Sequence, residues 1–143
     1  MVRRYQSPDK PFELDSANAA RDFLSRSGAS DTQTDLICDA IAFHTSALAS
    51  LRAPQVGLVG TGAGADVFGS GLQALSAALV GEVLAAFPRL NFKVEFRSNL
   101  LDYCRRKPRA QMGTWTDAFC RANVKNYHFP TLDERLIESP FAD

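Results

Sequence analysis

A helical stripe of apolar residues in the first third of the chain constrains the fold more than any other feature. Its members follow one another at steps of four, three, four and three residues: Ile37, Ile41, His44, Leu48 and Leu51. A helix of 3.6 residues per turn places residues at these steps on one face. Ser30 and Asp31 are good N-caps. The pattern predicts one helix from there to about Leu51, with His44 on its buried side.

The same period recurs along most of the chain. Asp15 or Ser16 is expected to cap a helix that ends near Arg26, because Gly28 favours a helix stop. Further amphipathic patterns cover 72–87, 92–107 and 114–122. Pro88 and Pro108 end the first two of these patterns, since proline interrupts a helix. Trp115 lies on the apolar face of the last one and is expected to anchor the core.

The domain organisation follows from this pattern. Pro8 and Pro11 predict an irregular segment over 1–14. A helical domain is expected over 15–122, followed by a tail over 123–143 that lies on the surface as a loop with a short helix. The chain of 143 residues suits one domain. The sequence therefore predicts an all-α fold, a compact bundle of five or six helices.

A glycine-rich stretch over 54–69 allows two interpretations. Val56–Gly60 followed by Gly62 and Ala65 is similar to the strand and G-x-G-x-x-A turn of dinucleotide-binding proteins. That site requires a parallel sheet, and the surrounding patterns are helical. The favoured interpretation is a helix, in which each interior glycine costs about 1 kcal/mol unless close packing or a bound ion compensates.

The helical interpretation places Asp66 on an inward face with Val56, Val59 and Ala63. His44 is expected to point inward as well. Buried polar groups need partners. The two side chains are therefore predicted either to form a structural pair, with each other or with the backbone, or to be what remains of a metal site.

Composition excludes several classes of protein. Lys plus Arg and Asp plus Glu each number 16, so the net charge is zero and argues against a nucleic-acid partner. No apolar run approaches the ~18 residues of a membrane-spanning helix. The three cysteines, Cys38, Cys104 and Cys120, are widely spaced and odd in number. They are expected to be free thiols, which points to the cytoplasm.

Several motifs resemble the HD superfamily, and in particular its cyanamide-hydratase-like branch. They are Phe12-Glu-Leu-Asp15-x-Ala-x-Ala-Ala-x-x-Phe23-Leu, Asp39-Ala-Ile-Ala-Phe-His44-Thr45-Ser46 and Gly62-Ala-Gly-Ala-Asp66-Val. The stretches Glu82–Arg89, Arg105–Pro108 and Gly113-Thr114 fit the same branch. The resemblance covers roughly residues 11–122 and suggests the C-terminal part of an HD domain.

The resemblance implies a helical domain that binds a divalent metal, zinc above all, and hydrates a nitrile-type small molecule such as cyanamide to urea. A zinc-bound water has a pKa near 7 and can act as a nucleophilic hydroxide. On this resemblance Asp66 matches an aspartate ligand, and His44 matches a histidine of the same pocket. Thr45 is expected to contact the substrate.

The chain departs from the family at its defining motif. Its two histidines, His44 and His128, are followed by Thr45 and Phe129, so the His-Asp dipeptide is absent. A catalytic zinc site normally takes three protein ligands, and this chain is expected to supply two at most. We therefore expect a partial domain that is inactive alone, either a fragment or a short homologue without catalysis. Loss of the upstream helices is expected to bare apolar surface, which favours self-association or a covering partner.

Three functions follow from the sequence. The first is an HD-type metal-dependent hydratase or hydrolase-like domain that acts on a small molecule. The second is a non-catalytic helical interaction or oligomerisation domain. The third, more distant, is a dinucleotide-binding fragment.

Overall fold

The computed structural model describes residues 3–111 and 113–141, and all regular structure in these ranges is helical. The α-helices are α1 (Phe12–Arg26), α2 (Asp31–Phe43), α3 (Ala49–Arg52), α4 (Pro54–Phe68), α5 (Ala77–Ala86), α6 (Phe92–Arg106), α7 (Thr116–Asn123) and α8 (Leu132–Ile137). Three 3₁₀ turns, η1 (Arg3–Tyr5), η2 (Leu72–Ala74) and η3 (Pro108–Gln111), connect or precede them. The all-α bundle predicted from the sequence is confirmed, and six of its helices have eight residues or more.

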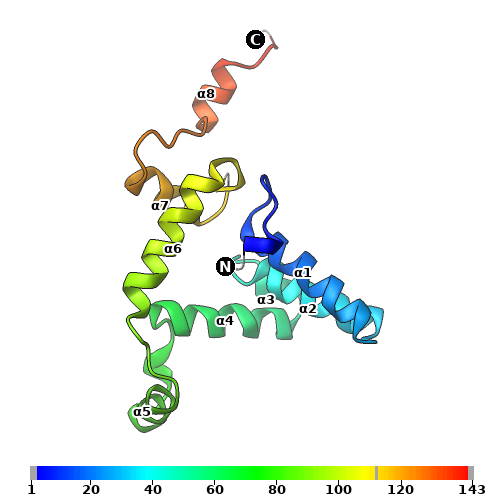
Figure 1. The fold of residues 1–143 in the computed structure, drawn as a ribbon, viewed down its shortest axis with the longest axis vertical. Coiled ribbons are helices and arrows are strands. Elements are labelled where there is room, and N and C mark those ends of the chain that lie inside the picture. The colour runs from blue at the N-terminus through cyan, green and yellow to red at the C-terminus, as the bar shows by residue number, and fades with distance from the viewer. Residues whose placement is uncertain (1–2, 112, 142–143) are drawn as a thin grey trace.

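The helices form two packed groups (Figure 1). In one group α1 packs on α2, and α4 packs across α2 and α3. In the other, α6 packs against η3 and α7. Helices α5 and α8 lie at opposite ends of the molecule, and neither contains a buried residue. No helix in the described part of the chain is both long and apolar enough to cross a membrane.

The helix predicted over 31–51 is interrupted. Ser30 forms a capping box with Gln33, as its sequence favours. Helix α2 then ends at Phe43, and a turn closed by the bond from Ser46 N to Phe43 O (2.8 Å) leads to α3. The hydroxyl of Ser46 accepts a hydrogen bond from Leu48 N, an alternative to helical bonding that serine readily offers. The predicted apolar stripe is not buried as a unit: Leu48 and Leu51 beyond the interruption are exposed, and Ile37 within α2 is exposed as well.

The first helix also begins earlier than predicted. Its N-cap is Pro11, and Asp15 lies inside the helix with 5% of its surface exposed. The carboxylate of Asp15 accepts hydrogen bonds from Lys107 Nζ (2.6 Å) and from Ser7 N (3.0 Å). Since Lys107 and Ser7 engage this carboxylate, Asp15 does not act as a cap. The resulting buried ion pair joins α1 to the end of α6.

The glycine-rich stretch forms helix α4, so the favoured interpretation of 54–69 is confirmed. The alternative interpretation, a strand at Val56–Gly60, is wrong. Pro54 at the first helical position has the φ angle that a helix needs. Gly69 ends the helix with a φ of 76°, a conformation in which a residue with a Cβ is strained.

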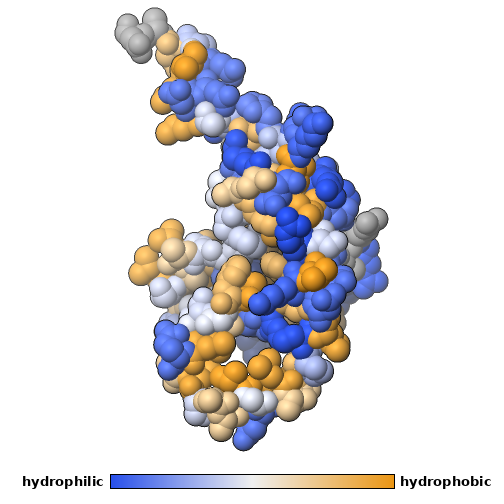
Figure 2. Space-filling view, turned by 90° about the vertical axis from the view of Figure 1, so that its left-hand side faces the viewer, coloured by the Kyte–Doolittle hydropathy of each residue, from blue (hydrophilic) through white to orange (hydrophobic). Residues whose placement is uncertain are grey.

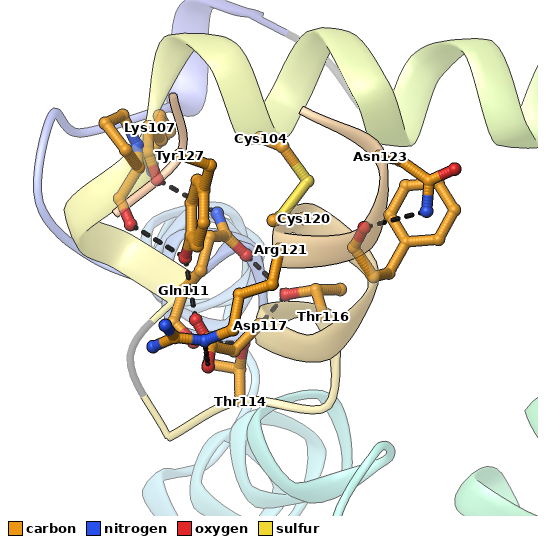
Figure 3. Close-up of a disulfide and its surroundings, with 12 residues drawn as sticks. Cys104, Lys107, Gln111, Thr114, Thr116, Asp117, Cys120, Arg121, Asn123 and Tyr127 are labelled. Atoms are coloured by element: carbon orange, nitrogen blue, oxygen red, sulfur yellow. Dashed lines mark hydrogen bonds and ion pairs between the residues drawn. A yellow bond between two sulfur atoms is a disulfide. The ribbon is translucent and has the colours of Figure 1, made fainter. Parts of the chain in front are cut away.

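The prediction of three free thiols is wrong. Cys104 in α6 and Cys120 in α7 form a disulfide, and only Cys38 is a free cysteine in the described part of the chain. Figure 3 shows the disulfide between the two helices. The two cysteines are 16 positions apart, a spacing that is not typical of any disulfide framework, and the turn at η3 brings them together.

Candidate functional site

A cavity of about 710 Å³ opens between the two helix groups. Its walls come from the turn between α2 and α3, from one face of α4, from Phe12 of α1, from Phe96 of α6 and from Trp115 before α7. The lining is mainly apolar and aromatic, with several hydroxyl groups and no Lys, Arg, Asp or Glu side chain. A volume of this size is typical of sites for small organic ligands.

His44 lines this cavity and is half-buried. Its Nδ1 lies 2.7 Å from the carbonyl oxygen of Ile41. A carbonyl oxygen can only accept a hydrogen bond, so Nδ1 must carry the proton. In the neutral ring Nε2 then keeps a lone pair for a ligand. The ring of Phe12 meets the His44 ring edge-on at 5.8 Å.

Thr45 is joined through Glu13 to the opposite wall of the cavity. The Thr45 hydroxyl donates to Glu13 Oε1 (2.8 Å), and Trp115 Nε1 donates to the same oxygen (3.2 Å). Only 5% of the Glu13 surface is exposed. Its second oxygen, Oε2, is buried and has no hydrogen-bond partner in the described part of the chain. A carboxylate therefore lies directly behind two residues of the cavity wall.

Sequence reasoning missed Glu13 and misjudged Trp115. The period of α1 did not predict that Glu13 would be buried, because the residues that cover it are 32 and 102 positions away. Trp115 is 37% exposed and forms part of the cavity wall, not a core anchor. Its ring meets that of Phe68 edge-on at 6.2 Å.

The inward orientation predicted for Asp66 is wrong. Its side chain is 63% exposed, forms an ion pair with Arg89 and does not line the cavity. Helix α4 contacts the His44 backbone at Gly60. Six residues later the helix has turned by about 240° and advanced by about 9 Å, so the Asp66 side chain lies on another face of α4, away from His44. His44 and Asp66 do not contact each other: His44 bonds to the backbone, which was the other predicted possibility, and Asp66 pairs with Arg89.

The donor groups of the described residues do not by themselves fit a catalytic metal ion. Within residues 3–111 and 113–141, no three His, Cys, Asp or Glu side chains lie close enough together to hold one. The other histidine, His128, lies in the tail with Nε2 4.0 Å from Glu134 Oε1. Of the residues that the resemblance assigns to the metal, His44 alone borders the cavity.

The position of Trp115 is supported by a network around the disulfide (Figure 3). Gln111 is fully buried, donates to the carbonyl of Lys107 (3.0 Å) and accepts from the hydroxyl of Thr116. Tyr127 donates to Asp117 (2.8 Å), and burial together with this bond raises the pKa of the Tyr127 hydroxyl. These contacts, together with the covalent link, hold the start of α7 against α6.

Comparisons of the chain with protein-family models, with curated proteins and with solved structures gave no match.

Proposed function

We propose that this chain carries the substrate pocket of an HD-type metal-dependent hydratase or hydrolase-like domain. The reaction implied by the resemblance is hydration of a nitrile-type small molecule, as in the conversion of cyanamide to urea. The observation that carries the proposal is the cavity itself, because His44 and Thr45 border it together. The resemblance assigns these two neighbours to the metal site and to substrate contact.

The position of the proton on the neutral His44 ring supports this role. Metal-binding histidines usually donate their second ring N–H to a carbonyl or carboxylate, which fixes the tautomer and orients the ring. The contact of His44 Nδ1 with the Ile41 carbonyl has this form. The side chain could therefore offer Nε2 to a metal ion without rearrangement.

Catalysis would require groups beyond this chain. A catalytic zinc takes three protein ligands and keeps a fourth position for water. The missing ligands would come from an upstream segment or from a second chain. When bound, the metal would supply an activated water, while the residues of this chain would hold the substrate and keep bulk water from it.

Zinc binding tests the proposal through the two histidines. The purified chain and its His44→Ala and His128→Ala variants are dialysed against Zn²⁺ and measured by elemental analysis. With the further ligands supplied by a second copy of the chain, we expect bound zinc in the native protein and in His128→Ala, and its loss in His44→Ala. An Asp66→Ala variant shows whether Asp66 leaves its ion pair with Arg89 to bind zinc, because its bound zinc would then fall below that of the native chain. Absence of zinc from every sample, or equal zinc in all of them, would contradict the metal site. Cyanamide hydration is then assayed as urea release by the zinc-loaded chain.

A second function, oligomerisation through an apolar surface, is favoured by helix α5. We define the α5 surface as seven exposed residues in and beside this helix: Leu72, Leu75, Leu79, Val83, Leu84, Phe87 and Leu90. Figure 2 shows apolar side chains gathered at this end of the molecule. Monomeric proteins rarely expose a contiguous apolar patch of more than a few hundred Å². This function needs no metal and predicts association in sedimentation experiments.

The cytoplasmic location stays a prediction. Its argument from three free thiols no longer holds, because Cys104 and Cys120 are joined. The predicted absence of a nucleic-acid partner rests on the balanced charge alone.

A further inference from the structure

Three polar residues of the cavity wall, His44, Thr45 and Trp115, already use the N–H or O–H groups that they could donate. The single hydroxyl proton of Thr45 is donated to Glu13, so its oxygen offers the cavity only lone pairs. His44 donates from Nδ1 to a carbonyl, so Nε2 is an acceptor in the neutral ring. The one indole N–H of Trp115 is engaged by Glu13 as well. A ligand that donates several hydrogen bonds would match these groups.

A buried acidic side chain, Glu13, lies behind the cavity wall. Glu13 lies behind Thr45 and Trp115 with 5% of its surface exposed, and no Lys or Arg within residues 3–111 and 113–141 forms an ion pair with it. The nearby buried cation, Lys107, is paired with Asp15 instead. A buried carboxylate that has only neutral donors is costly unless a positive charge approaches it. No basic side chain lines the cavity to supply that charge.

Aromatic rings surround the same space. The cavity is lined by Phe12 of α1, Phe68 of α4, Phe96 of α6 and Trp115 before α7. The face of an aromatic ring carries negative charge and attracts a cation, most strongly for tryptophan. A planar cation can also stack on such a ring, as a guanidinium group does. The rings and the carboxylate therefore favour the same kind of ligand.

We propose that the cavity binds a small planar organic cation of the amidinium or guanidinium type, and that Glu13 determines this preference. In the metal-free chain the N–H groups of the ligand would donate to Thr45 Oγ1 and His44 Nε2, and its charge would be balanced by Glu13 across the Thr45 hydroxyl. This inference rests on the proposed function in one respect, namely that the cavity takes a small molecule. It needs no metal ion.

Three ligands of nearly equal size and different charge test the proposal on the native chain. They are benzamidinium, benzamide and benzoate, with charges of plus one, zero and minus one. Trp115 is the one tryptophan of the chain, so its fluorescence reports binding directly. We expect benzamidinium to bind at least about tenfold more tightly than benzamide. The reason is that the Glu13 carboxylate, about two hydrogen bonds away, attracts the positive charge of benzamidinium. Benzoate is expected to show no saturable binding.

A pair of variants assigns the preference to Glu13. Glu13→Gln keeps an oxygen for Thr45 and Trp115 but removes the charge, so we expect benzamidinium affinity to fall to that of benzamide. Asp22→Asn removes an equal charge from an exposed position of α1 and should leave both affinities unchanged. Circular dichroism checks that each variant is folded. The comparison of the three ligands on the native chain does not depend on any variant.

Each alternative result has a definite meaning. Equal affinity for benzamidinium and benzamide, or tighter binding of benzoate, would overturn the inference and leave the zinc experiment as a separate test. An unchanged benzamidinium preference in folded Glu13→Gln would overturn the role of Glu13. No binding of any of the three ligands would overturn the inference and also remove the small-molecule pocket from the proposed function.

Discussion

Close packing accounts for two of the four interior glycines of α4. A Cβ added at Gly60 would lie 3.0 Å from the carbonyl oxygen of His44, and one added at Gly57 would lie 3.0 Å from Ser50 Cα. These neighbours are backbone atoms, which cannot move aside as a side-chain end can. The cost of about 1 kcal/mol per glycine is thus compensated at these positions by close packing. Gly62 has no atom within 4 Å of such a Cβ, so packing does not require it.

Alanine substitutions at these glycines should have opposite effects on stability. Gly62→Ala should raise the free energy of unfolding by up to about 1 kcal/mol, the gain in helix propensity. Gly60→Ala gains the same amount but adds overpacking that typically costs about 1–3 kcal/mol, so we expect a net loss of roughly 1 kcal/mol. Urea unfolding followed by circular dichroism measures both values. A Gly60→Ala variant as stable as Gly62→Ala would contradict the close approach of α4 to His44.

The pairing of α6 with α7 depends on the disulfide and on the polar network around it. Cys104 and Cys120 are both fully buried, as are Gln111 and Thr116 beside them. Helix α7 has only eight residues, and isolated helices of that length are marginal in water. A covalent link that closes a loop of about 15 residues is worth about 3 kcal/mol in the chain-entropy account.

Thiol counting and thermal unfolding test the role of this link. The unfolded, unreduced chain should have one alkylatable thiol, Cys38, and the reduced chain should have three. Replacing Cys104 and Cys120 together by alanine should lower the free energy of unfolding by about 2–4 kcal/mol. A reductant should lower the melting temperature of the native chain but not that of this variant. Three reactive thiols without reduction would show that the link does not form.

The whole molecule exposes much of the apolar surface that its helices carry. Among the residues that the structure describes, ten are buried and hydrophobic, and their continuous cluster is small, with Ala40, Ala49 and Val56 at its centre. Helix α5 makes no comparable contact, and Phe87 and Leu90 beside it are 74% and 83% exposed. Such a surface is expected to be covered in the stable state, and a second copy of the chain offers an identical patch.

Analytical ultracentrifugation over a range of concentrations tests this expectation. The native chain should associate, and a Leu79→Ser, Phe87→Ser double variant should shift toward the monomer because it removes apolar area from the α5 surface. Phe23→Ser, at an exposed apolar residue of α1, is the matched control and should not change the association. A native chain that stays monomeric at all concentrations would contradict oligomerisation through this surface.

Much of the helical architecture can be read from the sequence. Periodicity, the Ser30 capping box and the prolines at 54, 88 and 108 all act within a turn or two of the chain, so they predict helices without knowledge of the fold. The wrong cap of the first helix arose because a side chain found a distant partner. Asp15 is a good cap by its neighbours alone, yet it pairs with Lys107, 92 positions away.

The candidate site shows the same division. The resemblance pointed to His44 and Thr45, and both line the cavity. It also pointed to Asp66, which the rotation of α4 carries away from His44 to Arg89. Glu13 and Trp115 enter the site only because α1 and the start of α7 meet across 102 positions. Helix formation follows local steric and hydrogen-bonding rules, whereas the meeting of distant side chains depends on how the helices pack, which no local pattern specifies.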